Sequence, residues 1–158
     1  MTQPMEWQPG MVTHENAIFV CFGGLSNTGY ITALAGMEAV RRVGLKKAAI
    51  FCLAGLPVEV KMVLAKAKAA KKIITVDGCA NNCAKKLVEA AGFPITRSIT
   101  LAVDLGVKKV PLHRDLDGEP KDVMEYISQE DVARTVEAIL AAIEGEEPAA
   151  ASASGGEA

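Results

Sequence analysis

The chain has 158 residues, a length typical of one domain, and half of its residues are hydrophobic, which is enough for a buried core. A formal net charge of -2 excludes a generally basic protein that binds by neutralising nucleic-acid phosphates. Aromatic residues make up only 4%, so a stacking platform for single-stranded nucleic acid is not expected. The four cysteines are too few for a small disulfide scaffold, and their positions therefore need another explanation.

The two ends of the chain differ in composition from the middle. Residues 1–15 are polar and contain prolines, so we expect a flexible arm, within which Met11 is an alternative start. Residues 146–158 are rich in Ala, Ser, Gly and Glu, and a disordered tail is expected there. One α/β domain is predicted over 16–145. Because we recognise neither a signal peptide nor an apolar segment long enough to cross a bilayer, we expect a cytoplasmic protein with reduced thiols and no membrane contact.

The first half of the domain alternates short apolar runs with helical patterns. A strand is predicted at 17–22, and the helix that follows at 30–43 has a glycine after it as a C-terminal stop. A second strand at 48–53 leads into a helix at 57–70, where Pro57 occupies the first turn.

The second half continues this alternation. A strand at 72–76, a helix at 79–91 and a fourth strand at 97–103 are predicted, whereas 108–117 fits neither pattern. In the last helix, Ser128 resembles the N-cap of a capping box, and apolar residues recur on one stripe. That stripe consists of Val132, Val136, Ile139, Leu140 and Ile143.

Strands that are apolar throughout, separated by helices, are typical of βαβ units. We therefore expect a three-layer α/β domain with about four mainly parallel strands and helices on both faces, of the flavodoxin-like or Rossmann-like kind. Ligands of such folds bind beyond the carboxyl ends of the strands.

The cysteines gather at that functional edge. Cys21 and Cys52 lie at the ends of the first and second strands, and Cys79 follows the third. Cys83 comes four residues later, so that both thiols share one helix face if Cys79 opens the helix. Short side chains on three strand ends converge most easily if the first strand lies between the second and third. This predicts the strand order 2-1-3-4.

Four convergent thiols favour a tetrahedral Zn²⁺ site, either closed by all four cysteines or open with three ligands and one free thiol. Soft thiolates suit iron as well, so an iron–sulfur cluster is an alternative, as is a redox protein whose thiols cycle through a disulfide. Cys21 and Cys52 are also compatible with a plain core role, in which no cofactor is bound.

The loop after the first strand is a candidate anion or ligand site. Gly23, Gly24, Ser26, Asn27 and Thr28 offer backbone amides and hydroxyls at the start of a helix. The Gly-Lys-Ser/Thr ending of a P-loop is missing, and a tight turn with Ser26 or Asn27 as a cap is the simpler interpretation.

Other residues near the cysteines have candidate supporting roles. Asp77, with Gly78 after it, is expected to cap the third helix or to orient a thiolate. Lys85 either offsets the negative charge of a zinc–thiolate centre or lies on a solvated face. His113 would complete a metal site if one cysteine is not a ligand, although a lone loop histidine usually has no such role.

A basic patch lies around the second helix, and it is more typical of a solvated face than of a surface for an acidic partner. It contains Lys61, Lys66, Lys68, Lys71 and Lys72. As partner we expect an unidentified small molecule or protein, and neither nucleic acid nor a membrane. The oligomeric state stays open.

One segment resembles a known family. The segment from Asp77-Gly78-Cys79 to Cys83-Ala84-Lys85-Lys86 is similar to the signature of the DGC-domain family, named after its Asp-Gly-Cys tripeptide and proposed to bind zinc. Residues 21–29, 52–56 and 104–109 resemble further blocks of that family in the same order.

The resemblance implies that Cys21, Cys52, Cys79 and Cys83 are metal ligands, and it implies no reaction. The chain departs from the family at Pro57-Val58-Glu59, where relatives have a glycine-rich stretch. A ligand that those glycines admit in relatives is expected to be excluded or held differently here.

Overall fold

The computed structural model describes residues 8–119 and 121–146. The expected N-terminal arm lies partly outside these residues, and the expected tail lies almost entirely outside them. The strands are β1 (Asn16–Val20), β2 (Ala48–Ile50), β3 (Lys72–Asp77) and β4 (Arg97–Thr100). The α-helices are α1 (Asn27–Val43), α2 (Lys61–Ala69), α3 (Cys83–Ala90), α4 (Leu101–Asp104) and α5 (Gln129–Glu144). The 3₁₀ helices are η1 (Leu53–Gly55), η2 (Leu112–Asp115) and η3 (Val123–Tyr126).

The sheet has the predicted order β2-β1-β3-β4, and each neighbouring pair is parallel. Ile18 of β1 aligns with Ile50 of β2 on one side and with Ile74 of β3 on the other. The carboxyl ends of β1, β2 and β3 therefore meet at one edge, as the cysteine positions require.

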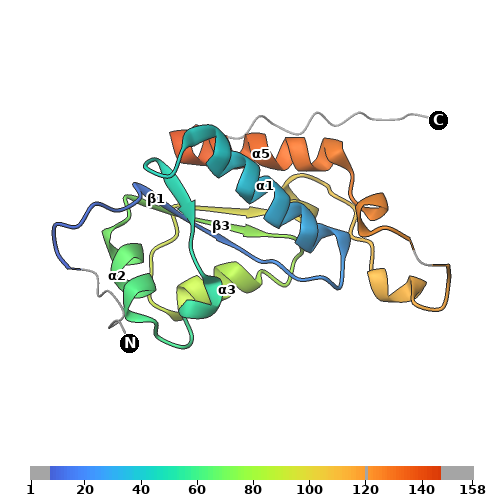
Figure 1. The fold of residues 1–158 in the computed structure, drawn as a ribbon, viewed down its shortest axis with the longest axis horizontal. Coiled ribbons are helices and arrows are strands. Elements are labelled where there is room, and N and C mark those ends of the chain that lie inside the picture. The colour runs from blue at the N-terminus through green and yellow to red at the C-terminus, as the bar shows by residue number, and fades with distance from the viewer. Residues whose placement is uncertain (1–7, 120, 147–158) are drawn as a thin grey trace, which may run out of the picture.

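Helices cover both faces of the sheet and make the predicted three layers, with α1 and α5 on one face and α2 and α3 on the other (Figure 1). Because side chains alternate along a strand, β1 contributes to two cores. Ile18 belongs to the cluster beneath α1 and α5, whereas Ala17 and Phe19 belong to the cluster beneath α2 and α3. Both faces are thus apolar, which explains the uninterrupted hydrophobic runs of the strands.

The prediction for the second helix is wrong at its start. Pro57 is fully outside α2, because η1 and a series of turns occupy the chain as far as Val60, and α2 begins at Lys61. Within these turns Glu59 adopts a left-handed conformation with φ of 53°, which interrupts a helix.

The third helix also begins later than predicted, at Cys83 rather than Cys79. Residues from Cys79 to Asn82 form a turn in which the Asn82 N–H donates to the Cys79 carbonyl. Asn82 is left-handed, with φ of 51°. The expectation that Cys79 and Cys83 share one helix face is therefore wrong.

The remaining elements differ from the predictions mainly at their ends. Strand β4 stops at Thr100, whose N–H donates to the Asp104 carboxylate at 2.7 Å as α4 begins. The ambiguous 108–117 segment contains η2 and an isolated bridge between Ser26 and Pro111. The Ser128 hydroxyl caps α5 as predicted, accepting from the Asp131 N–H at 3.2 Å. In the described part of the chain, no helix is long and apolar enough to cross a membrane.

Candidate thiol site

Cys21 directly follows β1 and continues its hydrogen bonding. Its N–H donates to the Val76 carbonyl of β3 at 2.9 Å, and its own carbonyl accepts from the Thr32 hydroxyl of α1 at 2.6 Å. The Cys21 backbone is therefore held between the sheet and the first helix. This fixes the position of its Cα atom at the carboxyl edge of the sheet, from which the thiol extends.

Cys79 is held at the same edge through Gly78. A Cβ atom at Gly78 would lie 2.8 Å from the Thr28 hydroxyl oxygen and 2.9 Å from the Thr28 carbonyl carbon. Only a residue without a side chain allows this close approach between the loop after β3 and the first turn of α1. The Asp-Gly-Cys sequence thus places Cys79 beside the start of α1, which follows the loop from Cys21.

Cys83 is the first residue of α3, and the Asp77 carboxylate fixes this helix. One oxygen of Asp77 accepts from the Ala84 N–H at 2.7 Å, and the other accepts from the Lys85 N–H at 3.0 Å. These donors belong to the first turn, where backbone N–H groups have no partner inside the helix. The capping role predicted for Asp77 is therefore present, acting from the end of the preceding strand.

Three of the thiols lie close enough to influence one another. Burial raises the pKa of the Cys21 thiol to about 11, and negative charge on Cys83, Asp77 and Cys79 adds to this effect, as does a hydrogen bond with Cys83. Burial also raises the pKa of Asp77, although its hydrogen bonds from Ala84 and Lys85 act in the opposite direction. The surroundings of the Cys21 thiol therefore favour its protonated form until a cation is supplied.

Cys52 differs from the other three cysteines in its electrostatics, although Cys83 is exposed as well. Cys52 follows β2, its carbonyl accepts from the Gly55 N–H at 3.1 Å as η1 begins, and its side chain is exposed. It is not among the groups that shift the pKa of Cys21. All four cysteines are free thiols. Within the described residues, no three His, Cys, Asp or Glu side chains are close enough together to hold a metal ion in this conformation.

The loop from Gly23 to Thr28 is a tight turn. A Cβ atom at Gly29 would lie 2.0 Å from the Gly23 carbonyl oxygen, so the two ends of the loop touch. Ser26 occupies the N-cap position of α1, but its hydroxyl pairs with the Thr28 hydroxyl at 3.0 Å rather than with the helix backbone. The Asn27 side chain also bonds to residues outside the helix, so neither Ser26 nor Asn27 caps α1 through its side chain.

Asn27 joins this loop to a distant segment. Its side-chain amide donates to the Lys108 carbonyl at 3.0 Å and accepts from the Val110 N–H at 2.7 Å. The polar side chains of this loop already have partners within the protein, which leaves the backbone amides as donors for an anion. An anion-binding role for the loop, including Gly24, stays a prediction.

The other predicted residues lie in different settings. Lys85 is half-buried, and its positive charge acts on the Asp77 carboxylate, which places it next to the thiol region. His113 is exposed in η2. It belongs to no group of potential ligands among the residues that the structure describes.

Sequence reasoning considered Thr28 only as part of an anion loop and missed Thr32, although both threonines hold the site together. Thr28 and Thr32 are both buried in α1, where one contacts Gly78 and the other binds the Cys21 carbonyl. Their spacing of four residues, on a helix that follows the first cysteine, was the available signal. Asn82 was also missed as a structural residue, and its side-chain oxygen accepts from the Thr100 hydroxyl at 2.7 Å.

A parallel α/β sheet with cysteines following three adjacent strands defines an α/β protein with a thiol site at the carboxyl edge of its sheet. The sequence profile of the DGC domain matches residues 17–139, and the chain therefore belongs to the DGC-domain family. Neither the curated proteins nor the solved structures include a significant match to this chain.

Proposed function

We propose that the protein binds one Zn²⁺ ion through the thiolates of Cys21, Cys79 and Cys83, with Cys52 as the fourth ligand. The observation that carries this proposal is the placement of Cys21 and Cys79 directly after the adjacent parallel strands β1 and β3, with Cys83 next to them as a hydrogen-bond partner of the Cys21 thiol. Four sulfur donors match the preference of zinc for tetrahedral thiolate sites, with zinc–sulfur distances of about 2.3 Å.

Four thiols are suitable ligands for zinc, but in this conformation they are not yet close enough together to hold the ion. Zinc binding therefore requires the thiols to move towards one another. Cys52 starts from an exposed position at the end of the neighbouring strand, and it has to approach the other three thiols. The thiols must also lose their protons, so binding releases protons and becomes tighter as the pH rises towards the pKa of Cys21. In this proposal the protein works in the reducing cytoplasm, where free thiols persist.

The contact between Cys21 and Cys83 supports a second candidate function, that of a thiol–disulfide protein. Exchange with a small-molecule disulfide would oxidise these two thiols to one disulfide and reduce the small molecule to two thiols. This function requires only the Cys21–Cys83 pair, whereas zinc binding also requires Cys79.

Cobalt substitution tests the proposal directly. The reduced, metal-free protein is titrated with Co²⁺ and then with Zn²⁺ under anaerobic conditions, and metal content is measured independently by mass spectrometry. We expect one metal per chain, tetrahedral cobalt absorption, and sulfur-to-cobalt charge-transfer absorption that zinc removes. A brown protein with an iron–sulfur spectrum, or no binding by the reduced protein, would contradict zinc binding.

Single serine variants identify the ligands. Cys21→Ser, Cys79→Ser and Cys83→Ser should each lower the charge-transfer absorption. Each should also weaken binding about tenfold or more, because even the loss of a hydrogen-bond partner of a metal ligand costs about tenfold. Cys52→Ser distinguishes the closed site from an open one. His113→Ala is the matched control, and it should bind metal like the wild type. If Cys79→Ser binds normally while Cys21 and Cys83 form a disulfide on mild oxidation, the second candidate replaces the first.

A further inference from the structure

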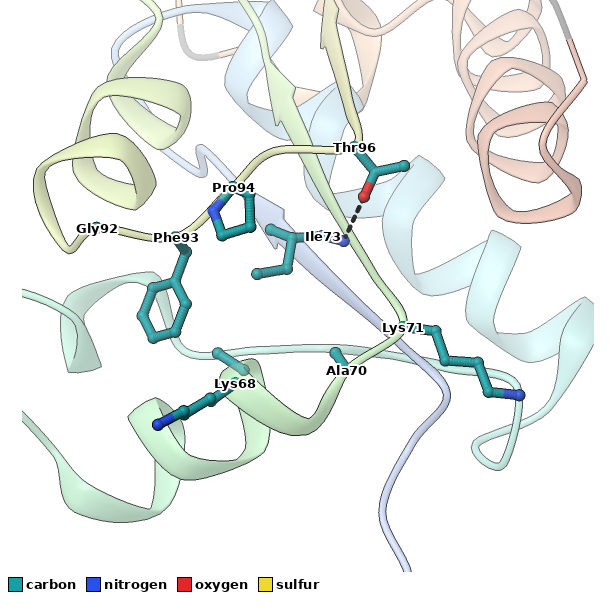
Figure 2. A pocket seen from close by; sticks show the side chains of 9 residues that line it. Lys68, Ala70, Lys71, Ile73, Gly92, Phe93, Pro94 and Thr96 are labelled. Atoms are coloured by element: carbon teal, nitrogen blue, oxygen red, sulfur yellow. Dashed lines mark hydrogen bonds between the residues drawn. The ribbon is translucent and has the colours of Figure 1, made fainter.

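A cavity of about 440 Å³ lies at the edge of the sheet opposite the cysteines. It opens between the end of α2, the start of β3 and the loop that joins α3 to β4 (Figure 2). Ile73 is the second residue of β3, and Thr96 directly precedes β4, so the cavity belongs to the amino ends of these strands. Its volume is within the range of small-molecule sites.

The inner wall of this cavity is apolar. Ala67 and Ile73, which line it, are buried. The Phe93 ring and the Pro94 ring face the same space from the loop after α3 (Figure 2). An organic ligand that covers these side chains would remove apolar surface from water, which favours binding.

The walls are held by hydrogen bonds, so the cavity is formed before any ligand arrives. The Thr96 hydroxyl oxygen accepts from the Ile73 N–H at 3.2 Å, and the Thr96 N–H donates to the Ile73 carbonyl at 2.8 Å. On the other side, the Phe93 N–H donates to the Val88 carbonyl at 3.2 Å. Gly92 turns the chain between these anchors with φ of 81°, a conformation that favours glycine.

The mouth of the cavity carries positive charge without a matching acidic residue among the lining side chains. Lys68 and Lys71 are both exposed there, and Figure 2 shows them extending to opposite sides. The Lys71 ammonium lies 3.8 Å from a carboxylate oxygen of Glu15 and is partly compensated. For Lys68, no ion pair or hydrogen bond of its ammonium group occurs within residues 8–119 and 121–146.

We propose that this cavity binds a small organic anion, a carboxylate with an apolar body. The apolar body packs on Ile73, Phe93 and Pro94, and the carboxylate pairs with the Lys68 ammonium at the mouth. This site is independent of the thiol site and needs neither metal nor thiol chemistry.

Fluorescent probes test both halves of this proposal. Anilinonaphthalene sulfonate combines an aromatic body with one negative charge, and N-phenyl-1-naphthylamine offers the same aromatic framework without the charge. We expect saturable binding of the charged probe to the folded protein, with octanoate as a competitor and octanamide as a poor one. Failure of octanoate to displace the probe, or equal displacement by octanamide, would overturn the proposal.

Two variants place the probe in this cavity. Lys68→Gln should weaken the charged probe about threefold, the size of one exposed ion pair, and leave the uncharged probe unchanged. Lys66→Gln removes a lysine from the same helix outside the cavity, and it should have no effect. Ala70→Phe fills the cavity and should reduce binding of both probes, with unchanged thermal unfolding as the check on folding. Normal binding by Lys68→Gln would show that the charged group is not held at this mouth.

Discussion

The buried carboxylate of Asp77 accepts a 2.7 Å hydrogen bond from the backbone N–H of Ala84, seven residues further along the chain. Its second oxygen accepts from Lys85, so one side chain at the end of β3 satisfies two donors in the first turn of α3. We expect Asp77→Ala to lower the free energy of unfolding by about 2 kcal/mol, because both donors lose their partner in a buried place. Urea denaturation of the reduced protein measures this loss.

The same change is expected to weaken zinc binding, because α3 begins with Cys83 and loses the contact that fixes its start. Asp77→Asn is the matched variant, since it keeps one acceptor oxygen without the charge and should recover part of the stability. If Asp77→Ala is as stable as the wild type and binds metal equally well, the carboxylate does not hold the site in place.

Gly78 supports a second prediction, because a side chain has no room there. An alanine would place its Cβ 2.8 Å from the Thr28 hydroxyl oxygen and 2.9 Å from the backbone of the same residue. Gly78→Ala should therefore cost about 2 kcal/mol and push Cys79 away from α1, which lowers metal affinity as well. Thermal unfolding and cobalt titration measure the two effects.

Gly23→Ala is the control for this glycine. Nothing lies within 4 Å of a Cβ atom at Gly23, although it belongs to the same edge of the sheet. It should leave unfolding within about 0.5 kcal/mol of the wild type, as surface changes usually do. Equal stability losses in both variants would mean that the close approach to Thr28 is not the cause.

The sheet order could be predicted because the positions of the cysteines restrict it. Thiols that follow three different strands converge most easily if β1 lies between β2 and β3, and the structure has this order. The strands could be predicted from their apolar runs, because both faces of the sheet are buried. The end of α1 could be predicted from Gly44, because its φ of 84° favours glycine.

The starts of α2 and α3 could not be predicted from local patterns. Pro57 suits a first helical turn, and the spacing of Cys79 and Cys83 suits a helix face, yet both segments are turns. In the second case Asp77 holds the helix start, as its predicted capping role implies, but the turn is also fixed by Thr100, whose hydroxyl donates to the side-chain oxygen of Asn82. Local sequence contains no record of such contacts, so the four thiols were expected to be closer together than they are.

The pKa of Cys21 leads to a prediction on reactivity. A thiol with a pKa of about 11 is only about one part in a thousand thiolate at pH 8, whereas a thiol with the ordinary pKa of 9.0 is about one part in ten. In the metal-free protein, Cys21 should therefore react with iodoacetamide roughly tenfold more slowly than a thiol of ordinary pKa, because the greater nucleophilicity of a more basic thiolate partly offsets its smaller population. Its rate should rise as the pH increases from 8 to 10.

Peptide mass spectrometry after timed alkylation resolves the individual cysteines. The exposed Cys52 provides the internal comparison, because its access to solvent differs from that of the half-buried Cys21. Cys83→Ser should speed the alkylation of Cys21, since it removes one source of negative charge next to that thiol. A Cys21 rate equal to that of Cys52 at pH 8 would contradict the raised pKa.

Asn27 ties the start of α1 to the segment before η2, and its removal should loosen that segment alone. The Val110 N–H donates to the Asn27 side-chain oxygen at 2.7 Å, so Asn27→Ala leaves this amide without its acceptor. We expect its hydrogen exchange to become at least tenfold faster, since a lost hydrogen bond of about 1.4 kcal/mol corresponds to that factor. Ser26→Ala removes a hydroxyl that pairs with Thr28, and it should leave the exchange of Val110 unchanged. Unaltered protection of Val110 in Asn27→Ala would show that other contacts hold this segment against the thiol edge.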